Sequence, residues 1–180
     1  MAAEHSIWLL PSAPEEEALA ALVASLAPRF CGQAFGPHVT VQGDLARPLE
    51  PLLRDTQMLA TRSEALQAHV SGLEHSPHFF RCLTLRLDAG AAFDALQVHM
   101  AHCNGSREGL SPYAHLSLAY GDASPQALAG AALAAIEREW VGRRMVLDRL
   151  AVVHSSKTVA IDQWRVLATF ELRPVAYWQR

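Results

Sequence analysis

Two short stretches, Pro37-His38-Val39-Thr40-Val41 and Ala114-His115-Leu116-Ser117-Leu118, share one pattern of side chains. Each contains a histidine, an apolar residue, a hydroxyl residue and a second apolar residue. Each is soon followed by Gly-Asp, at Gly43-Asp44 and Gly121-Asp122. The two copies lie too far apart in the sequence for a local turn to produce the repeat. The pattern therefore indicates a half-domain that occurs twice.

Strand geometry gives the repeated pattern a chemical meaning. Because side chains alternate between the two faces of a β-strand, each histidine shares a face with the hydroxyl two residues later. His38 and Thr40 then share one accessible face, as do His115 and Ser117, while their apolar neighbours point into a core. Two such strands side by side suit a phosphate, because hydroxyls donate to its oxygens and imidazoles exchange protons.

Length and composition limit the class of protein. The 180 residues can bury a substantial core, and 51% of them are apolar, which is typical of a globular chain. A net charge of −3 argues against a broad basic surface for nucleic acid, whereas a small nucleotide needs no such surface. We therefore expect a small-molecule partner. We also expect a monomer.

The cysteines and the first residues bear on where the protein works. Cys31, Cys82 and Cys103 are odd in number and show no paired spacing, which indicates reduced thiols. The N-terminal residues lack the positive patch and apolar run of a secretory signal, and no stretch reaches the apolar length of a membrane span. We expect a cytoplasmic protein that does not bind a membrane.

The rest of the chain predicts strands and helices in alternation. Besides the two histidine strands, we expect strands over 6–10, 66–73, 79–87, 144–153 and 163–172, and helices over 12–28, 49–60, 91–103 and 124–140. No Gly/Ser linker divides this order. We predict an α+β fold that forms a single bilobal domain over residues 1–180. Two similar lobes of antiparallel sheet, flanked by helices, would be related by a pseudo-twofold axis, with a central cleft between the histidine strands.

The residues described so far resemble a known family. The twin motifs resemble the His-x-Thr/Ser-x signature of the 2H phosphoesterase superfamily. Similarity to its cyclic phosphodiesterase branch, found in plants and yeast, extends to four further segments. These are Ser6–Pro11, Phe79–Cys82, Pro112–Tyr120 and Leu147–Ala151, the last followed by the strand of Trp164.

The resemblance implies an enzyme that needs no metal and no cofactor. Members of this branch open nucleoside 2′,3′-cyclic phosphates to 2′-phosphates, and ADP-ribose 1″,2″-cyclic phosphate to ADP-ribose 1″-phosphate. Carried over to this chain, the resemblance makes His38 and His115 the catalytic imidazoles. It implies that Thr40 and Ser117 hold the phosphate.

Three aromatic residues are further site candidates through the resemblance. Tyr120 matches a tyrosine near the phosphate, and Trp8 and Phe80 match aromatic residues that stack on the nucleobase. Each also has a simpler interpretation. By strict alternation Tyr120 lies on the face opposite His115, unless the strand twists or ends at Gly121, and Trp8 and Phe80 lie in apolar segments where core packing is the default.

Two other groups of residues have the spacing of metal ligands. His75 and His78 are separated by a Ser-Pro turn, and His99, His102 and Cys103 lie on a predicted helix. Ligands could converge from both groups, but one group spans a turn and the other lies on a helix. We therefore predict no metal site.

The predicted reaction is in-line attack of water on a cyclic phosphodiester. A free imidazole titrates near pH 6.5, so one histidine can accept the proton of water while the other protonates the departing oxygen. Because the motifs are nearly symmetric, we assign His115 as the base and His38 as the acid only as a starting hypothesis. Two alternatives stay open: a 2H enzyme that acts on RNA ends, as 2′-5′ RNA ligase-like proteins do, and a non-catalytic nucleotide-binding module.

Overall fold

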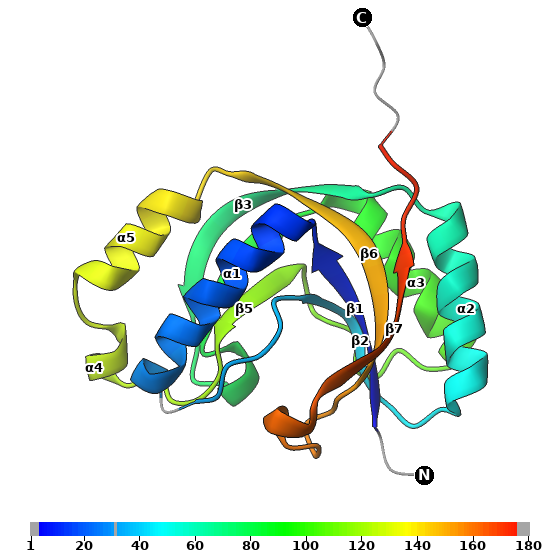
Figure 1. The fold of residues 1–180 in the computed structure, drawn as a ribbon, viewed down its shortest axis with the longest axis horizontal. Helices are drawn as coiled ribbons and strands as arrows, with labels where there is room; N and C mark the ends of the chain where they lie inside the picture. The colour runs from blue at the N-terminus through cyan, green and yellow to red at the C-terminus, as the bar shows by residue number, and fades with distance from the viewer. Residues whose placement is uncertain (1–3, 31, 176–180) are drawn as a thin grey trace, which may run out of the picture.

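The computed structural model describes residues 4–30 and 32–175, which form an antiparallel sheet with helices packed around it (Figure 1). The strands are β1 (His5–Pro11), β2 (Val39–Leu45), β3 (Leu66–His75), β4 (Leu83–Asp88), β5 (His115–Ala119), β6 (Arg144–His154) and β7 (Arg165–Glu171). The α-helices are α1 (Ala13–Leu26), α2 (Leu49–Arg62), α3 (Gly90–Asn104), α4 (Pro125–Leu128) and α5 (Ala131–Trp140). Three short 3₁₀ turns are η1 (Ala27–Phe30), η2 (Phe79–Arg81) and η3 (Ile161–Gln163).

The sheet closes on itself like a barrel. Its strands follow the order β1-β2-β5-β4-β3-β6-β7, and β1 also pairs with β6. The long strand β6 pairs with two strands along different parts of its length. Residues 144–147 pair with β3, and residues 149–154 pair with β7. All of these pairs are antiparallel, so the predicted α+β class with antiparallel sheet is confirmed.

The predicted duplication is visible in the topology. A strand, a helix and a motif strand follow one another twice, as β1-α1-β2 and as β4-α3-β5. In both units the first strand pairs with the motif strand. The two motif strands meet at the pair Val39 and Leu116. Because the pair is antiparallel, extending it by one residue in each direction matches His38 with Ser117 and Thr40 with His115.

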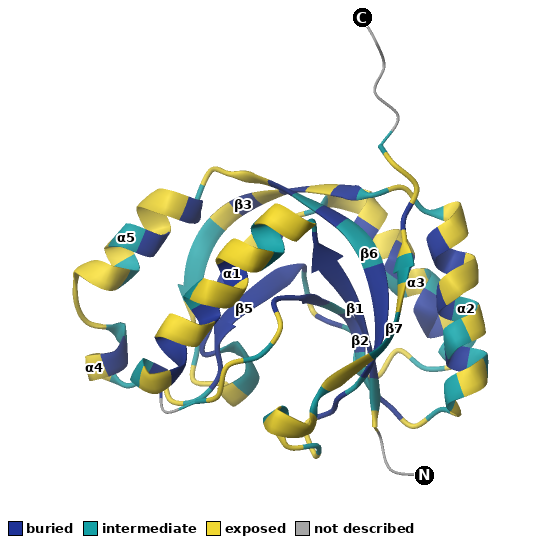
Figure 2. Cartoon of the chain, in the orientation of Figure 1, coloured by how far each residue is buried: buried dark blue, intermediate teal, exposed yellow. Residues whose placement is uncertain are grey.

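The alternation of the motif strands separates a core face from a polar face. Val39, Val41, Leu116 and Leu118 are fully buried in the main hydrophobic core. In Figure 2 the strands β1 and β5 are dark and buried, whereas the outer faces of the surrounding helices are exposed. The opposite face of each motif strand is left to the histidines and hydroxyls.

Two predicted elements are interrupted in the structure. The strand expected over 79–87 begins only at Leu83, and η2 precedes it. The helix expected over 124–140 breaks between α4 and α5, where Gly130 adopts a φ of 102°. The guanidinium of Arg29 donates to the carbonyl oxygens of Ala127 and Ala129. The two carbonyl groups at the break therefore have hydrogen-bond donors from a distant part of the chain. The alanine-rich sequence of this segment gives no sign of that contact.

Two of the three cysteines lie in the described residues. Cys82 and Cys103 are free, and burial raises the pKa of the Cys82 thiol to about 11. Cys31 lies outside the described residues. Over residues 4–30 and 32–175, none of the helices has the length and apolar character needed to cross a membrane.

Candidate active site

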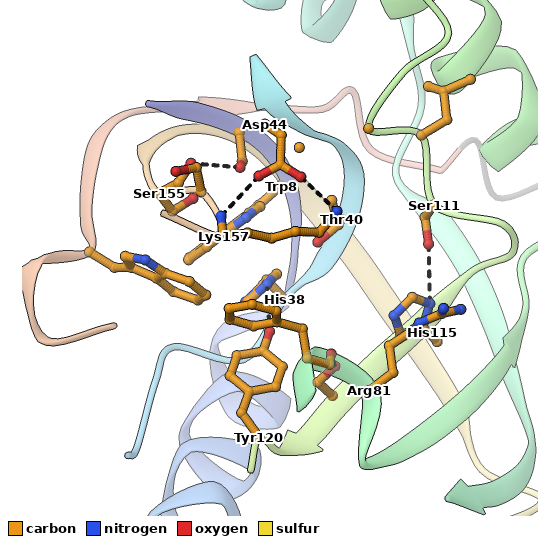
Figure 3. Close-up of a pocket in the computed structure, with 18 of the residues that line it drawn as sticks. Trp8, His38, Thr40, Asp44, Arg81, Ser111, His115, Tyr120, Ser155 and Lys157 are labelled. Atoms are coloured by element: carbon orange, nitrogen blue, oxygen red, sulfur yellow. Dashed lines mark hydrogen bonds and ion pairs between the residues drawn. The ribbon is translucent and has the colours of Figure 1, made fainter. Parts of the chain in front are cut away.

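A pocket of about 300 Å³ opens where the two motif strands meet (Figure 3). The residues that the sequence proposed for the site all contribute to its wall, namely Trp8, His38, Thr40, Phe80, His115, Ser117 and Tyr120. They come from both halves of the chain, so neither half forms this pocket alone. The geometry therefore brings together every proposed site residue.

His38 is held in one orientation and one tautomer. Its Nδ1 lies 2.7 Å from the carbonyl oxygen of Gly36, so Nδ1 carries the hydrogen and Nε2 is left as an acceptor. The hydroxyl of Tyr120 lies 3.4 Å from Nε2. The indole of Trp8 stacks on the imidazole, with ring centroids 3.6 Å apart and planes inclined by 6°.

Burial makes His38 a poor carrier of positive charge. Desolvation lowers its pKa to about 4, and the nearby His115 acts in the same direction. The hydrogen bond to Gly36 opposes this shift but is outweighed. Near neutral pH the His38 ring is therefore uncharged and can accept a proton at Nε2.

His115 has the same tautomer in different surroundings. Its Nδ1 lies 3.0 Å from the carbonyl oxygen of Tyr113 and 3.1 Å from the hydroxyl of Ser111, which itself donates to Tyr113. Burial is the main cause that lowers the pKa of His115. The bond to Tyr113 raises this pKa, Arg81 lowers it and Glu74 raises it. Unlike His38, His115 therefore titrates under the influence of charged side chains.

The two motif hydroxyls differ in how they are engaged. The hydroxyl of Ser117 is buried and donates to the carbonyl oxygen of Phe80 at 3.2 Å. Thr40 is half-buried, and its hydroxyl makes no hydrogen bond with the part of the chain that the structure describes. Both line the pocket, so either can turn toward an anion that enters it.

Tyr120 reaches the pocket because β5 ends at Ala119, one residue earlier. The simple alternation that would place its ring in the core therefore does not apply. Burial raises the pKa of Tyr120, so its hydroxyl stays protonated and remains a donor. The following Gly121 has a φ of 127° and passes close to the Phe30 carbonyl, which only glycine permits without strain.

The aromatic candidates occupy two different positions. One face of Trp8 is covered by His38, so its ring supports the imidazole from behind. Phe80 lies 5.3 Å from the ring of Tyr120 and 6.1 Å from that of Trp164. These three rings form one aromatic end of the pocket. Trp164 was expected only as a strand residue, and its alternating pattern carried no sign of a site.

The other end of the pocket is polar and was not expected from the sequence. Ser6, Ser155 and Ser156 contribute to it, and the ammonium of Lys157 lies 2.9 Å from the carboxylate of Asp44. The Gly-Asp repeat was the one signal for this end. Its second copy, Asp122, is exposed and does not line the pocket.

The candidate metal ligands do not converge. Among the residues described, no three His, Cys, Asp or Glu side chains are grouped as a metal ion would require. His75 ends β3 and His78 lies in the turn before β4, and both side chains are exposed.

Comparisons with known proteins depend on the fold, since the sequence matches no protein-family model and no curated protein sequence. LigT of E. coli, solved with 3′-AMP, superposes with a TM-score of 0.60 at 15% identity, covering 96% of this chain and 99% of that one. TT0787 of Thermus thermophilus gives 0.58 at 18% identity, with 96% and 100% covered. Usb1 of Kluyveromyces marxianus gives 0.52 at 12% identity, with 92% and 97% covered.

These likenesses extend over almost the whole of each chain, at identities where only the fold is comparable. The chain has the fold of the 2H phosphoesterases, as the twin motifs predict.

Proposed function

We propose that this protein hydrolyses cyclic phosphodiesters through acid–base catalysis by His38 and His115. The observation that carries the proposal is the shared pocket, in which two imidazoles and two hydroxyls from matching halves of the fold line one space of about 300 Å³. Since each half contributes one imidazole, we also propose that the chain works as one catalytic domain.

The surroundings of the two histidines favour His38 as the base and His115 as the acid. A base must be neutral, and the pKa of His38 is lowered to about 4. If His38 were the acid, the productive form would need the histidine of lower pKa to be protonated while the other was not. Only a small fraction of the protein would be in that form at any pH. We therefore reverse the assignment that the sequence alone suggested.

The proposed reaction begins with water held near Nε2 of His38. Nε2 takes a proton as the water oxygen forms a bond to phosphorus, and the bond from phosphorus to one sugar oxygen breaks. His115 gives its proton to that oxygen, so the ring opens to a phosphomonoester. The hydroxyls of Thr40 and Ser117 donate to the phosphoryl oxygens, and the hydroxyl of Tyr120, 3.4 Å from Nε2, orients the water.

We propose nucleoside 2′,3′-cyclic phosphates and ADP-ribose 1″,2″-cyclic phosphate as the substrate class. The pocket volume is at the lower end of the range for ligand sites and suits one nucleotide. Phe80, at the aromatic end, is the side chain we expect to contact the nucleobase. We propose that Trp8 instead stabilises His38, since that ring covers one of its faces.

The binding of a nucleotide by a neighbour supports the same class. LigT was solved with 3′-AMP, a nucleoside monophosphate. RNA ends remain the second candidate substrate, because the resemblance also includes 2′-5′ RNA ligase-like enzymes that act on them. The net charge of −3 favours the smaller substrate.

One assay tests the proposal. Purified protein is incubated with the four nucleoside 2′,3′-cyclic phosphates, with ADP-ribose 1″,2″-cyclic phosphate and with an oligonucleotide that ends in a 2′,3′-cyclic phosphate. ³¹P NMR then identifies the products. We expect turnover to 2′-phosphates or to the 1″-phosphate, and we expect it to persist in EDTA.

The outcomes separate the alternatives. Preference for the oligonucleotide would indicate an enzyme of RNA ends. Loss of activity in EDTA that zinc restores would refute the metal-independent mechanism. Tight binding in calorimetry without any turnover would show a nucleotide-binding module.

A further inference from the structure

Arg81 supplies a positive charge that the proposed reaction does not yet use. It closes the turn η2, lines the pocket and lies beside His115 in Figure 3. Its side chain is half-buried, and within residues 4–30 and 32–175 its guanidinium takes part in no hydrogen bond and no ion pair. A partly desolvated cation without a partner is unfavourable unless an anion occupies the site.

The charges around the pocket show which anion would fit. Asp44 and Lys157 neutralise each other through their ion pair. Burial keeps His38 uncharged near neutral pH. Apart from His115, which is charged only when protonated, Arg81 therefore leaves the described pocket wall with a single positive charge, in a chain whose net charge is −3. A phosphodiester carries one negative charge, and guanidinium matches phosphoryl oxygens in geometry as well as charge.

The backbone around Arg81 is hydrogen-bonded to the second motif strand and to the residue that follows Tyr120. The carbonyl oxygen of Phe79 accepts from the amide of Gly121, and that of Phe80 accepts from the hydroxyl of Ser117. The carbonyl oxygen of Arg81 itself accepts from the hydroxyl of Ser76 at 2.7 Å. The turn is thus held at three consecutive carbonyls. Its position relative to Ser117 is set before any ligand arrives, as electrostatic catalysis requires.

We propose that Arg81 is a further catalytic residue, whose guanidinium contacts a non-bridging phosphoryl oxygen on the His115 side of the pocket. This inference rests on the proposed function. As water adds to phosphorus and its proton passes to His38, the phosphoryl group gains negative charge until the sugar oxygen leaves with the proton of His115. Arg81 stabilises that added charge.

The position of Arg81 also affects the acid. Its positive charge lowers the pKa of His115. The acid must be protonated in the free enzyme, so activity declines as pH rises through the pKa of His115. Removing the guanidinium should therefore move this descending limb of the kcat/KM profile to higher pH. A residue that only supported the fold would not produce that shift.

The test compares Arg81→Met, Arg81→Lys and Arg107→Met. Arg107 is exposed and does not line the pocket, so its variant loses the same charge elsewhere. We expect Arg81→Met to lower kcat/KM by roughly 10²- to 10³-fold, as the loss of one donor to a developing oxyanion does. Arg81→Lys should retain part of the activity, and Arg107→Met nearly all of it. Matching thermal unfolding of the variants would show that the fold is kept.

A binding experiment separates this inference from the proposed function. Calorimetry with adenosine 2′-monophosphate needs no turnover, and Arg81→Met should bind it more weakly than Arg107→Met does. If no cyclic phosphate is hydrolysed by the wild type, the proposed function fails, while this measurement still tests the anion contact. If Arg81→Met equals Arg107→Met in kcat/KM, in the descending limb and in binding, Arg81 has no such role.

Discussion

The two motif strands have the same pattern, yet their neighbours in the sheet differ at one matched position. In the first half, Trp8 on β1 is opposite Thr40. In the second half, Thr84 on β4 is opposite Ser117. The indole of Trp8 reaches across and covers the imidazole of His38. Thr84 is too short to cover His115 in the same way.

This difference shows how two copies of one motif can have different roles. His38 is enclosed by aromatic rings and has a pKa of about 4. His115 is also buried, but Arg81 and Glu74 act on its pKa in opposite directions. One imidazole is thereby kept neutral and suited to accept a proton. The other remains adjustable by nearby charge, including the charge of a bound phosphate.

The largest expected effect on activity comes from removing each imidazole in turn. His38→Ala and His115→Ala should each lower kcat by about 10²- to 10⁴-fold, because each loses one proton-transfer step. His69→Ala is the matched control, since His69 is exposed on β3 and does not line the pocket. Steady-state kinetics with the preferred cyclic phosphate provide the measurement. A variant at either position that keeps most of its turnover would exclude that histidine from the mechanism.

The second prediction concerns stability, where the buried His38 should show a large effect. In the unfolded chain its pKa is near 6.5, and in the folded protein it is about 4. The unfolded state therefore binds more protons in this interval, and the free energy of unfolding should fall as pH falls from about 6.5 to 4. His38 alone accounts for up to about 3 kcal/mol of this loss.

Urea unfolding followed by circular dichroism at several pH values measures the effect. His38→Gln should have a flatter dependence of unfolding free energy on pH than the wild type. Parallel curves for the two proteins would show that His38 is not held neutral by the fold.

A third experiment sharpens the division between base and acid. A phosphodiester with a nitrophenolate leaving group, such as bis(4-nitrophenyl) phosphate, needs no proton on the departing oxygen. The activity of His115→Ala, expressed as a fraction of wild-type activity, should therefore be about 10-fold or more higher on this substrate than on the cyclic phosphate. The corresponding fraction for His38→Ala should not rise. Recovery by His38→Ala instead would restore the reverse assignment.

The smallest expected effect tests the covering of His38 by Trp8. The kcat/KM profile of the wild type should rise as His38 loses its proton near pH 4 and decline as His115 does so below its usual pKa of 6.5. Trp8→Phe keeps an aromatic ring but reduces the covered area, so the pKa of His38 should increase. The rising limb should move to higher pH by roughly one unit or less, in proportion to partial loss of burial.

A control at the matched position completes this experiment. Thr84→Ser changes the corresponding side chain in the second half, and it should leave the rising limb in place. If both variants have the same pH profile of kcat/KM as the wild type, stacking on Trp8 does not determine the pKa of His38.

The fold and the central residues could be predicted because their signals are local. Alternation in each motif placed Val39 and Leu116 in the core and His38 and His115 on the opposite face. Repetition of the motif indicated two matching halves. The break before α5 lies at Gly130, and Arg29, which is distant in the sequence, donates to carbonyls beside it; neither feature was used in the prediction.

Some of the pocket could not be predicted, because it depends on contacts between separate segments. Lys157 and Asp44 are brought together by the closing of the sheet, and Trp164 joins Phe80 and Tyr120 from the last hairpin. Lys157 and Trp164 have no neighbour in the sequence that marks them, and Asp44 is marked only by the Gly-Asp repeat.

The sequence by itself determined that this chain has two copies of one histidine strand and which side chains of each strand share a face. Period-two alternation is a property of the backbone, so it needs no tertiary contact. The tertiary structure decided how the copies differ, through Trp8 over His38 and Arg81 beside His115. The pKa of an imidazole depends on burial and nearby charge, and both arise only when distant segments pack together.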